Sequence, residues 1–235
     1  MSRQVLGGPR GASVILLAGG EAAADRGVVL CPEVRGVDAN IEDYAARLLD
    51  EGYRVAVVDP WARHGGPPAL DAPEAISAAV ARLDDGLALA DVGFARDCLG
   101  AVAGAAVLGF CLGGLHARLA AACVPGFHAA VEFYGRIVYP TLTPQKPVQP
   151  LDLLPGRRAA LLCHFGTADP AAPAAHVDEL ERRLAFQPIP ARVHRYPGCG
   201  HGFANPASPS GNAEAATLAW SRSLRWLDEH LPGGG

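Results

Sequence analysis

Residues 105–114 read AAVLGFCLGG, and this stretch decides the fold. Its first six residues are apolar or glycine and predict a buried β-strand, whereas the residues from Leu112 onward predict a helix. Gly109, Cys111 and Gly113 between them match the G-x-S-x-G turn of a nucleophile elbow, with cysteine in place of serine. Such a turn presents the thiol at a helix N-terminus, where the helix dipole favours a thiolate. The alternative is a glycine-rich turn with a buried, inert cysteine.

Short apolar strands alternate with longer amphipathic stretches on both sides of this turn. The predicted strands are Ser13–Leu17, Gly27–Cys31, Arg54–Asp59, Ala105–Phe110, Ala129–Tyr134, Ala159–Phe165 and Arg192–Tyr196. The predicted helices are Asn40–Glu51, Pro73–Leu89, Leu112–Cys123, Ala174–Ala185 and Ala213–His230. This order predicts an α/β fold with a mostly parallel sheet that helices cover on both faces. No shift in composition marks a boundary, so residues 1–235 are predicted to form a single domain.

The composition excludes several classes of protein. Of 235 residues, 50% are hydrophobic and 19% are charged, which is incompatible with an intrinsically disordered chain. The formal net charge is −4, and no basic stripe is present to neutralise phosphates, so we expect no nucleic-acid partner. No apolar run approaches the roughly 18 residues of a membrane span, so we expect no membrane partner. Arg3 and Arg10 precede a short apolar run that weakly resembles a signal peptide, but we interpret residues 13–17 as a strand.

The cysteine pattern indicates neither disulfides nor a metal site. Six cysteines are present, and none of them forms a C-x-x-C pair, so we expect no structural zinc. Most of them lie in apolar stretches, where a free cysteine behaves as a small hydrophobic residue. A reducing environment suits such a chain, and the predicted location is therefore cytoplasmic.

Two downstream residues complete a candidate catalytic set with Cys111. An elbow nucleophile is followed in the chain by an acid and then by a histidine, each on a loop after a later strand. Asp169 follows the predicted strand Ala159–Phe165, and His201 follows Arg192–Tyr196. Asp169 alone could be a turn residue, and His201 alone could be a loop histidine held by backbone groups. Their order and their positions after strands favour a Cys-His-Asp triad.

Several further motifs resemble those of the dienelactone hydrolases, or carboxymethylenebutenolidases. They are the elbow with cysteine, Glu33 in PEVRGV, the segment Trp61-Ala62-Arg63, Asp169, and the loop GHGF at residues 200–203. The resemblance extends from about Val28 to the last predicted helix. It implies an α/β-hydrolase fold, a Cys-His-Asp triad and hydrolysis of a lactone or related ester, without a metal or organic cofactor.

The resemblance and the elbow rule assign roles around the nucleophile. Glu33 matches the family carboxylate that lies beside the resting thiol and helps to form the thiolate when substrate binds. A carboxylate in that place can accept the thiol proton and opposes a permanent thiolate by charge repulsion. Its alternative role is that of a solvated loop charge. The backbone N–H groups of Leu112 and Val34 are the expected oxyanion donors.

The remaining candidate residues concern the substrate. Arg63 matches the family arginine that holds the substrate carboxylate, a task that suits a planar guanidinium. Trp61 stands where the family has tyrosine, and Phe203 lies in the loop that carries His201. The second family arginine falls at Asn205, so this chain lacks that charge. A less anionic ester or lactone is therefore as compatible with the sequence as a dienelactone, and Arg63–Pro73 is a candidate lid.

Two other functions remain open from the sequence. The first is a carboxylesterase or thioesterase of broad specificity. The second is a non-catalytic α/β domain that binds a small ligand or responds to oxidation at Cys111 or Cys199. The expected partner is a small-molecule ester or lactone, with or without a carboxylate group, and the expected assembly is a monomer or a small homo-oligomer.

Overall fold

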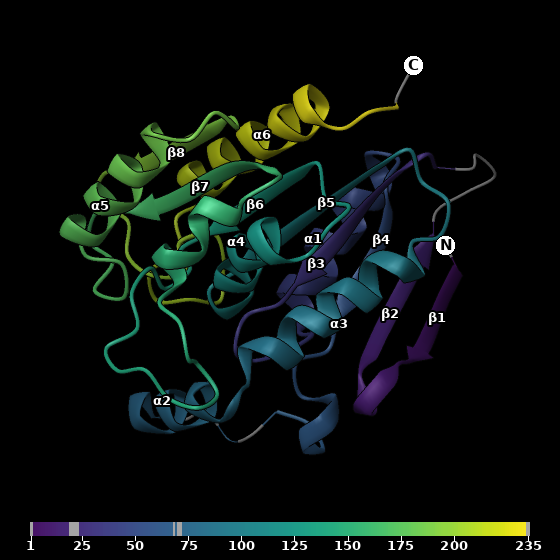
Figure 1. Cartoon of the computed structure of the whole chain (residues 1–235), viewed down its shortest axis with the longest axis horizontal. Helices are drawn as coiled ribbons and strands as arrows, with labels where there is room; N and C mark the ends of the chain where they lie inside the picture. The colour runs from purple at the N-terminus through teal and green to yellow at the C-terminus, as the bar shows by residue number, and fades with distance from the viewer. Residues whose placement is uncertain (1, 19–23, 68, 70–71, 234–235) are drawn as a thin grey trace.

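An eight-stranded sheet forms the centre of the computed structural model, which describes residues 2–18, 24–67, 69 and 72–233 (Figure 1). The strand order is β1-β2-β4-β3-β5-β6-β7-β8. The strands are β1 (Ser2–Gly7), β2 (Ser13–Ala18), β3 (Arg26–Cys31), β4 (Arg54–Val58), β5 (Gly104–Phe110), β6 (Ala129–Phe133), β7 (Ala160–Gly166) and β8 (Ala191–Tyr196). β1 and β2 pair antiparallel and the pairs from β4 to β8 are parallel, so the prediction of a mostly parallel α/β-hydrolase sheet is confirmed.

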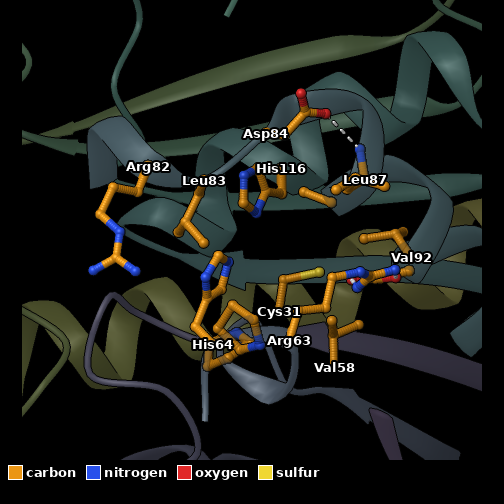
Figure 2. A pocket seen from close by; sticks show the side chains of 14 residues that line it. Cys31, Val58, Arg63, His64, Arg82, Leu83, Asp84, Leu87, Val92 and His116 are labelled. Carbon is orange, nitrogen blue, oxygen red and sulfur yellow. Dashed lines mark hydrogen bonds and ion pairs between the residues drawn. The ribbon is translucent and has the colours of Figure 1, made fainter. Parts of the chain in front are cut away.

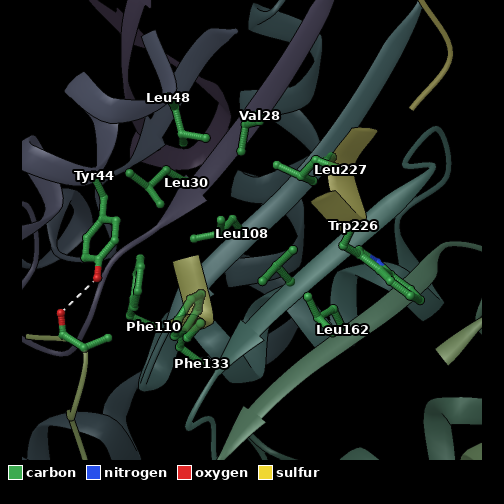
Figure 3. Close-up of a cluster of buried hydrophobic side chains, with 14 of the residues drawn as sticks. Val28, Leu30, Tyr44, Leu48, Leu108, Phe110, Phe133, Leu162, Trp226 and Leu227 are labelled. Atoms are coloured by element: carbon green, nitrogen blue, oxygen red, sulfur yellow. Dashed lines mark hydrogen bonds between the residues drawn. The ribbon is translucent and has the colours of Figure 1, made fainter. Parts of the chain in front are cut away.

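Helices cover both faces of the sheet, as predicted. They are α1 (Ala39–Asp50), α2 (Pro73–Arg82), α3 (Asp85–Cys98), α4 (Leu112–Cys123), α5 (Ala174–Ala185) and α6 (Ala213–His230). α1 and α6 pack on one face through a cluster that includes Tyr44, Leu108, Phe110 and Trp226 (Figure 3). α3, α4 and α5 pack on the other face. Burial of each large apolar side chain contributes about 1.5–3 kcal/mol, so these two layers supply much of the stability.

Two sequence predictions need correction. A single helix over Pro73–Leu89 is wrong, because the chain leaves the helical conformation at Leu83 (φ −76°, ψ 131°) between α2 and α3. Asp84 then caps α3 by accepting a hydrogen bond of 2.9 Å from the Leu87 N–H. The sequence analysis also missed a strand: β1 precedes the predicted first strand and pairs with it at the edge of the sheet. Part of the candidate lid, residues 68, 70 and 71, lies outside the described residues.

The parallel strands determine where the site forms. The carboxyl ends of β3 to β8 meet at one edge of the sheet, and in open α/β sheets this edge is where ligands bind. Glu33 follows β3, Cys111 follows β5, Tyr134 follows β6, Asp169 follows β7 and His201 follows β8. Residues more than 160 positions apart are therefore brought to one place.

Candidate active site

Cys111 occupies a strained turn between β5 and α4. Its backbone has φ 53° and ψ −112°, a conformation that L-amino acids rarely adopt. The Cys111 N–H donates a hydrogen bond of 2.9 Å to the Phe133 carbonyl, which fixes the turn against the end of β6. A Cβ atom on Gly109 would lie 2.0 Å from the Gly113 carbonyl oxygen, and one on Gly113 would lie 2.1 Å from the Cys31 carbonyl oxygen. The two glycines are therefore required for this close backbone packing.

The structure brings the three predicted triad residues together. His201 Nε2 lies 3.1 Å from Cys111 Sγ, and His201 Nδ1 lies 2.8 Å from Asp169 Oδ2. Asp169 is buried, and its other oxygen accepts a hydrogen bond of 2.8 Å from the Ala171 N–H. The carboxylate is thus fixed by its own loop, so that it can orient the imidazole toward the sulfur.

The surroundings of His201 favour its charged form. Burial by itself lowers the pKa of His201, but the hydrogen bonds with Asp169 and Cys111, together with their charges, raise that pKa to about 10. An imidazolium next to a sulfur stabilises a thiolate by direct charge attraction. A thiolate is the reactive form of a cysteine nucleophile.

Glu33 lies in the same site but bonds to other partners. Tyr134 donates from its hydroxyl to Glu33 Oε1 at 3.0 Å, and Asn205 Nδ2 donates to Glu33 Oε2 at 3.0 Å. Burial raises the pKa of Glu33, while these hydrogen bonds and the nearby His201 oppose that rise. The resting hydrogen bonds of the Glu33 side chain thus go to two neutral donors rather than to Cys111.

Tyr134 is a site residue that the sequence analysis did not single out. It is fully buried, has a positive φ of 41° and places its ring 5.2 Å from the His201 ring in an edge-on contact. Phe203 is also fully buried and packs against Tyr134, with ring centroids 5.4 Å apart. A tyrosine at the carboxyl end of a parallel strand, followed by glycine, was the signal that could have indicated this role.

The two expected oxyanion donors lie in adjoining segments. Leu112 is the first residue of α4, where a backbone N–H has no acceptor within the helix. Val34 packs in one apolar cluster with Leu112 and Trp61. Trp61 is fully buried, and its Nε1 donates a hydrogen bond of 2.7 Å to the Val34 carbonyl. Trp61 therefore anchors the loop that carries Val34.

Arg63 is paired with an acid of the protein itself. Its Nη1 forms an ion pair with Asp91 Oδ2, and its Nη2 donates to Asp91 Oδ1 at 2.6 Å. Nη2 also lies 3.3 Å from the Pro9 carbonyl oxygen. None of these hydrogen bonds joins Arg63 to a triad residue. Asp91 already binds both Nη atoms, which are the donors that a substrate carboxylate would need.

A buried ion pair lies beneath the elbow. Arg118 on α4 pairs with Glu132 on β6, and both side chains are fully buried. Arg118 also donates to the Arg136 carbonyl, and Cys163 Sγ lies 3.4 Å from Glu132 Oε2. This network holds the segment after Glu132, which contains both the Phe133 carbonyl and Tyr134. The sequence alone gave no indication of it, because the two partners lie on different elements.

Two further features concern metal-ligating clusters and membrane-spanning helices in the described part of the chain. Among residues 2–18, 24–67, 69 and 72–233, no group of three or more His, Cys, Asp or Glu side chains is placed to hold a metal ion. In the same residues, no helix has the length and apolar character that a bilayer crossing requires.

Comparisons with known proteins identify relatives of this chain. The sequence profile of the dienelactone hydrolase family matches residues 15–231. A Bradyrhizobium protein provisionally named a 2-oxo-3-(5-oxofuran-2-ylidene)propanoate lactonase is 33% identical over 211 residues, covering 88% of this chain and 84% of that protein. A provisionally named carboxymethylenebutenolidase of Escherichia coli K12 is 31% identical over 208 residues, covering 86% of this chain and 76% of that protein.

Solved structures share the fold of this chain. A provisionally named dienelactone hydrolase from Klebsiella pneumoniae superposes with a TM-score of 0.86 at 26% identity, covering 93% of both chains. The dienelactone hydrolase-like phosphotriesterase P91, from metagenomic libraries, superposes with a TM-score of 0.79 at 18% identity, covering 98% of both chains, and shows the shared fold. From the profile match and the relatives above 30% identity, the chain belongs to the dienelactone hydrolase family.

Proposed function

We propose that this dienelactone hydrolase-type enzyme cleaves a carboxylic ester or lactone through a covalent acyl-thioester on Cys111. The observation that carries the proposal is the contact of 3.1 Å between Cys111 Sγ and His201 Nε2, with Asp169 2.8 Å from the other ring nitrogen. Sulfur, imidazole and carboxylate are thereby in the geometric relationship that nucleophilic acyl transfer requires.

In the first half of the reaction, the Cys111 thiolate attacks the ester carbonyl carbon. The carbonyl oxygen becomes an oxyanion, which the N–H groups of Leu112 and Val34 would stabilise. When the tetrahedral intermediate collapses, the C–O bond breaks and His201 gives its proton to the leaving alkoxide. In a lactone the leaving oxygen stays attached to the acyl group.

In the second half, water attacks the thioester while His201 accepts a proton from it. The C–S bond breaks, the carboxylic acid leaves, and the sulfur and imidazole return to their starting state. Asp169 keeps the imidazole in the required orientation and stabilises its charged form. Glu33, with its raised pKa, is placed to exchange a proton in this site once substrate disturbs its bonds to Tyr134 and Asn205.

The substrate need not carry a carboxylate. Arg63 already binds Asp91, and Asn205 offers a neutral amide to Glu33. A substrate carboxylate would have to displace Asp91 from Arg63 and would approach the buried Glu33. These features favour the second candidate function, a carboxylesterase or thioesterase of broader specificity, over strict selection of dienelactones.

Replacement of Cys111 by alanine tests the proposal. We expect turnover of p-nitrophenyl acetate and of a dienelactone to fall by at least about a thousandfold, because no other group replaces the nucleophile. Cys199→Ala is the matched control, since Cys199 lies two residues from His201 but is buried. Unchanged rates in Cys111→Ala would remove Cys111 from the mechanism. If the wild-type protein shows no ester hydrolysis that iodoacetamide can inhibit, a ligand-binding or redox-responsive domain is favoured instead.

A further inference from the structure

A pocket that takes no part in the proposed mechanism lies between α3, α4 and the ends of β3 and β4 (Figure 2). Its volume is about 80 Å³, several times the roughly 10–15 Å³ that one water molecule needs in such a cavity. Within the described residues, its lining includes neither Cys111 nor His201. It therefore has room for a molecule larger than water, and it is separate from the reacting atoms.

His116 supplies a buried polar group to this pocket. It lies on α4, one turn beyond the elbow, and only 5% of its surface is exposed. Figure 2 shows its ring between the Leu83 and Leu87 side chains, with Cys31 across the pocket. The Nε2 atom is buried and has no hydrogen-bond partner among the residues that the structure describes. Buried polar atoms nearly always have a partner, so this nitrogen points to a missing one.

The pocket wall carries two basic side chains, Arg63 and Arg82, and two acidic ones, Asp84 and Asp91, so its formal charges balance. Burial lowers the pKa of His116 to about 3, so its ring is neutral near pH 7. Burial likewise raises the pKa of Cys31 to about 12, which keeps its thiol protonated. Arg63 and Asp91 both line the pocket but cancel each other in their ion pair. An ion in this pocket would lose hydration without meeting an excess of opposite charge in the wall.

The neutral ring also defines the group that fits it. In a neutral imidazole, one ring nitrogen donates a hydrogen bond and the other accepts one. The tautomer determines whether Nε2 is the donor or the acceptor. A hydroxyl can both donate and accept, so it satisfies Nε2 in either tautomer. The remaining walls, which include Val58, Leu83, Leu87 and Val92, suit an apolar body.

We propose that this pocket is a second ligand site, which binds a small uncharged molecule with an apolar body and one hydroxyl group that hydrogen-bonds to His116 Nε2. The occupant would contact Cys31 and Pro32, whose carbonyl groups pack against Gly113 of the elbow. It would also contact Leu83, which packs in one apolar cluster with Val34 and Leu112. The site thus adjoins the segments that carry the expected oxyanion donors.

Phenol, toluene and benzoate are suitable probes, because they share a ring and differ in the polar group. Binding to the full-length protein is followed by the ¹⁵N signals of the labelled histidine rings. We expect phenol to shift the His116 signal saturably, and toluene and benzoate to bind at least about tenfold more weakly, as a lost hydrogen bond or a buried charge would cause. The ¹⁵N signals report binding and do not depend on hydrolysis. The second-site proposal can therefore be contradicted while the proposed function holds, and the proposed function can be contradicted while phenol still binds.

Variants separate the role of His116 from general packing. We expect His116→Leu to bind phenol no more tightly than toluene, because the nitrogen is gone. His176→Leu is the matched control, since His176 on α5 also has a buried, unpartnered ring nitrogen but does not line the pocket. Should His116→Leu fail to fold, the comparison of the three probes on the wild-type protein decides. Equal affinity for phenol and benzoate, or no saturable shift at His116 with any probe, would overturn the proposal and leave a water-filled cavity.

Discussion

The Tyr134 hydroxyl donates a hydrogen bond of 3.0 Å to Glu33 Oε1, and the same tyrosine ring lies 5.2 Å from the ring of His201. One side chain therefore connects the buried carboxyl group to the imidazole of the proposed triad. Tyr134 is fully buried and has a positive φ of 41°, a backbone conformation that is strained for a residue with a side chain.

Tyr134→Phe should lower both the free energy of unfolding and the catalytic efficiency. Glu33 would lose one of its two side-chain donors, and an unsatisfied buried acceptor costs about 1–3 kcal/mol. We expect kcat/KM for p-nitrophenyl acetate to fall about tenfold, which corresponds to about 1.4 kcal/mol of transition-state stabilisation. Urea unfolding and steady-state kinetics measure the two effects.

The matched control is Tyr139→Phe, because the Tyr139 hydroxyl also donates to a buried carboxylate, Asp85 Oδ2, at 2.8 Å. That variant should lose similar stability and keep its kcat/KM. An equal loss of activity in the two variants would show that Tyr134 acts only through stability.

Selection for carboxylated substrates depends on whether the ion pair between Arg63 and Asp91 persists when substrate binds. Since both Nη atoms of Arg63 are bound by Asp91, we expect Arg63→Gln to reduce kcat/KM equally for a neutral ester and for a matched carboxylated ester. It should also lower the free energy of unfolding by about 3 kcal/mol, because Asp91 is left buried without its partner. A loss confined to the carboxylated ester would contradict this expectation and assign Arg63 to the substrate.

The buried pair of Arg118 and Glu132 allows a clean test of stability. Glu132→Leu leaves a fully buried guanidinium unpaired, so we expect a loss of about 3–5 kcal/mol in urea unfolding. The double variant Arg118→Met/Glu132→Leu should recover most of that loss, because it removes both charges. Glu179→Gln, in an exposed cluster with Arg182 and Arg183, should leave the free energy of unfolding nearly unchanged. A double variant as unstable as the single one would contradict the interpretation.

The raised pKa of His201 predicts how stability changes with pH. The folded pKa of about 10 exceeds the ordinary value, so the stabilisation from charged His201 is complete below about pH 6.5 and is lost as the pH rises through 10. The difference in free energy of unfolding between wild type and His201→Gln should therefore shrink between pH 7 and pH 10. A difference that stays constant over this range would contradict the charged form of His201.

The sequence predicted the sheet and the meeting of Cys111, Asp169 and His201 at one edge, because both follow from local patterns. Continuous apolar runs identified the buried strands, and the order of Cys111, Asp169 and His201 after separate strands placed them at one edge. The break between α2 and α3 escaped prediction, since the Asp84 cap interrupts a helical pattern that continues through it. β1 escaped as well, because an exposed edge strand lacks a continuous apolar run.

The partners of individual side chains could not be predicted from the sequence. Arg63 and Asp91 are 28 residues apart, and only the packing of α3 beside the loop after β4 brings them together. The same holds for the hydrogen bonds of Glu33 with Tyr134 and Asn205, which join three separate loops. Sequence patterns identify the elements that carry such groups, whereas their pairing depends on the tertiary structure.

The most direct test of the central claim is to trap the covalent intermediate. The enzyme is quenched with acid during turnover of p-nitrophenyl acetate, digested, and analysed by mass spectrometry. We predict one acetyl group on the peptide that contains Cys111, no such adduct in Cys111→Ala, and a much slower appearance of the adduct in His201→Gln. Steady turnover with the acetyl group on another residue, or an adduct that forms equally fast without His201, would contradict the account.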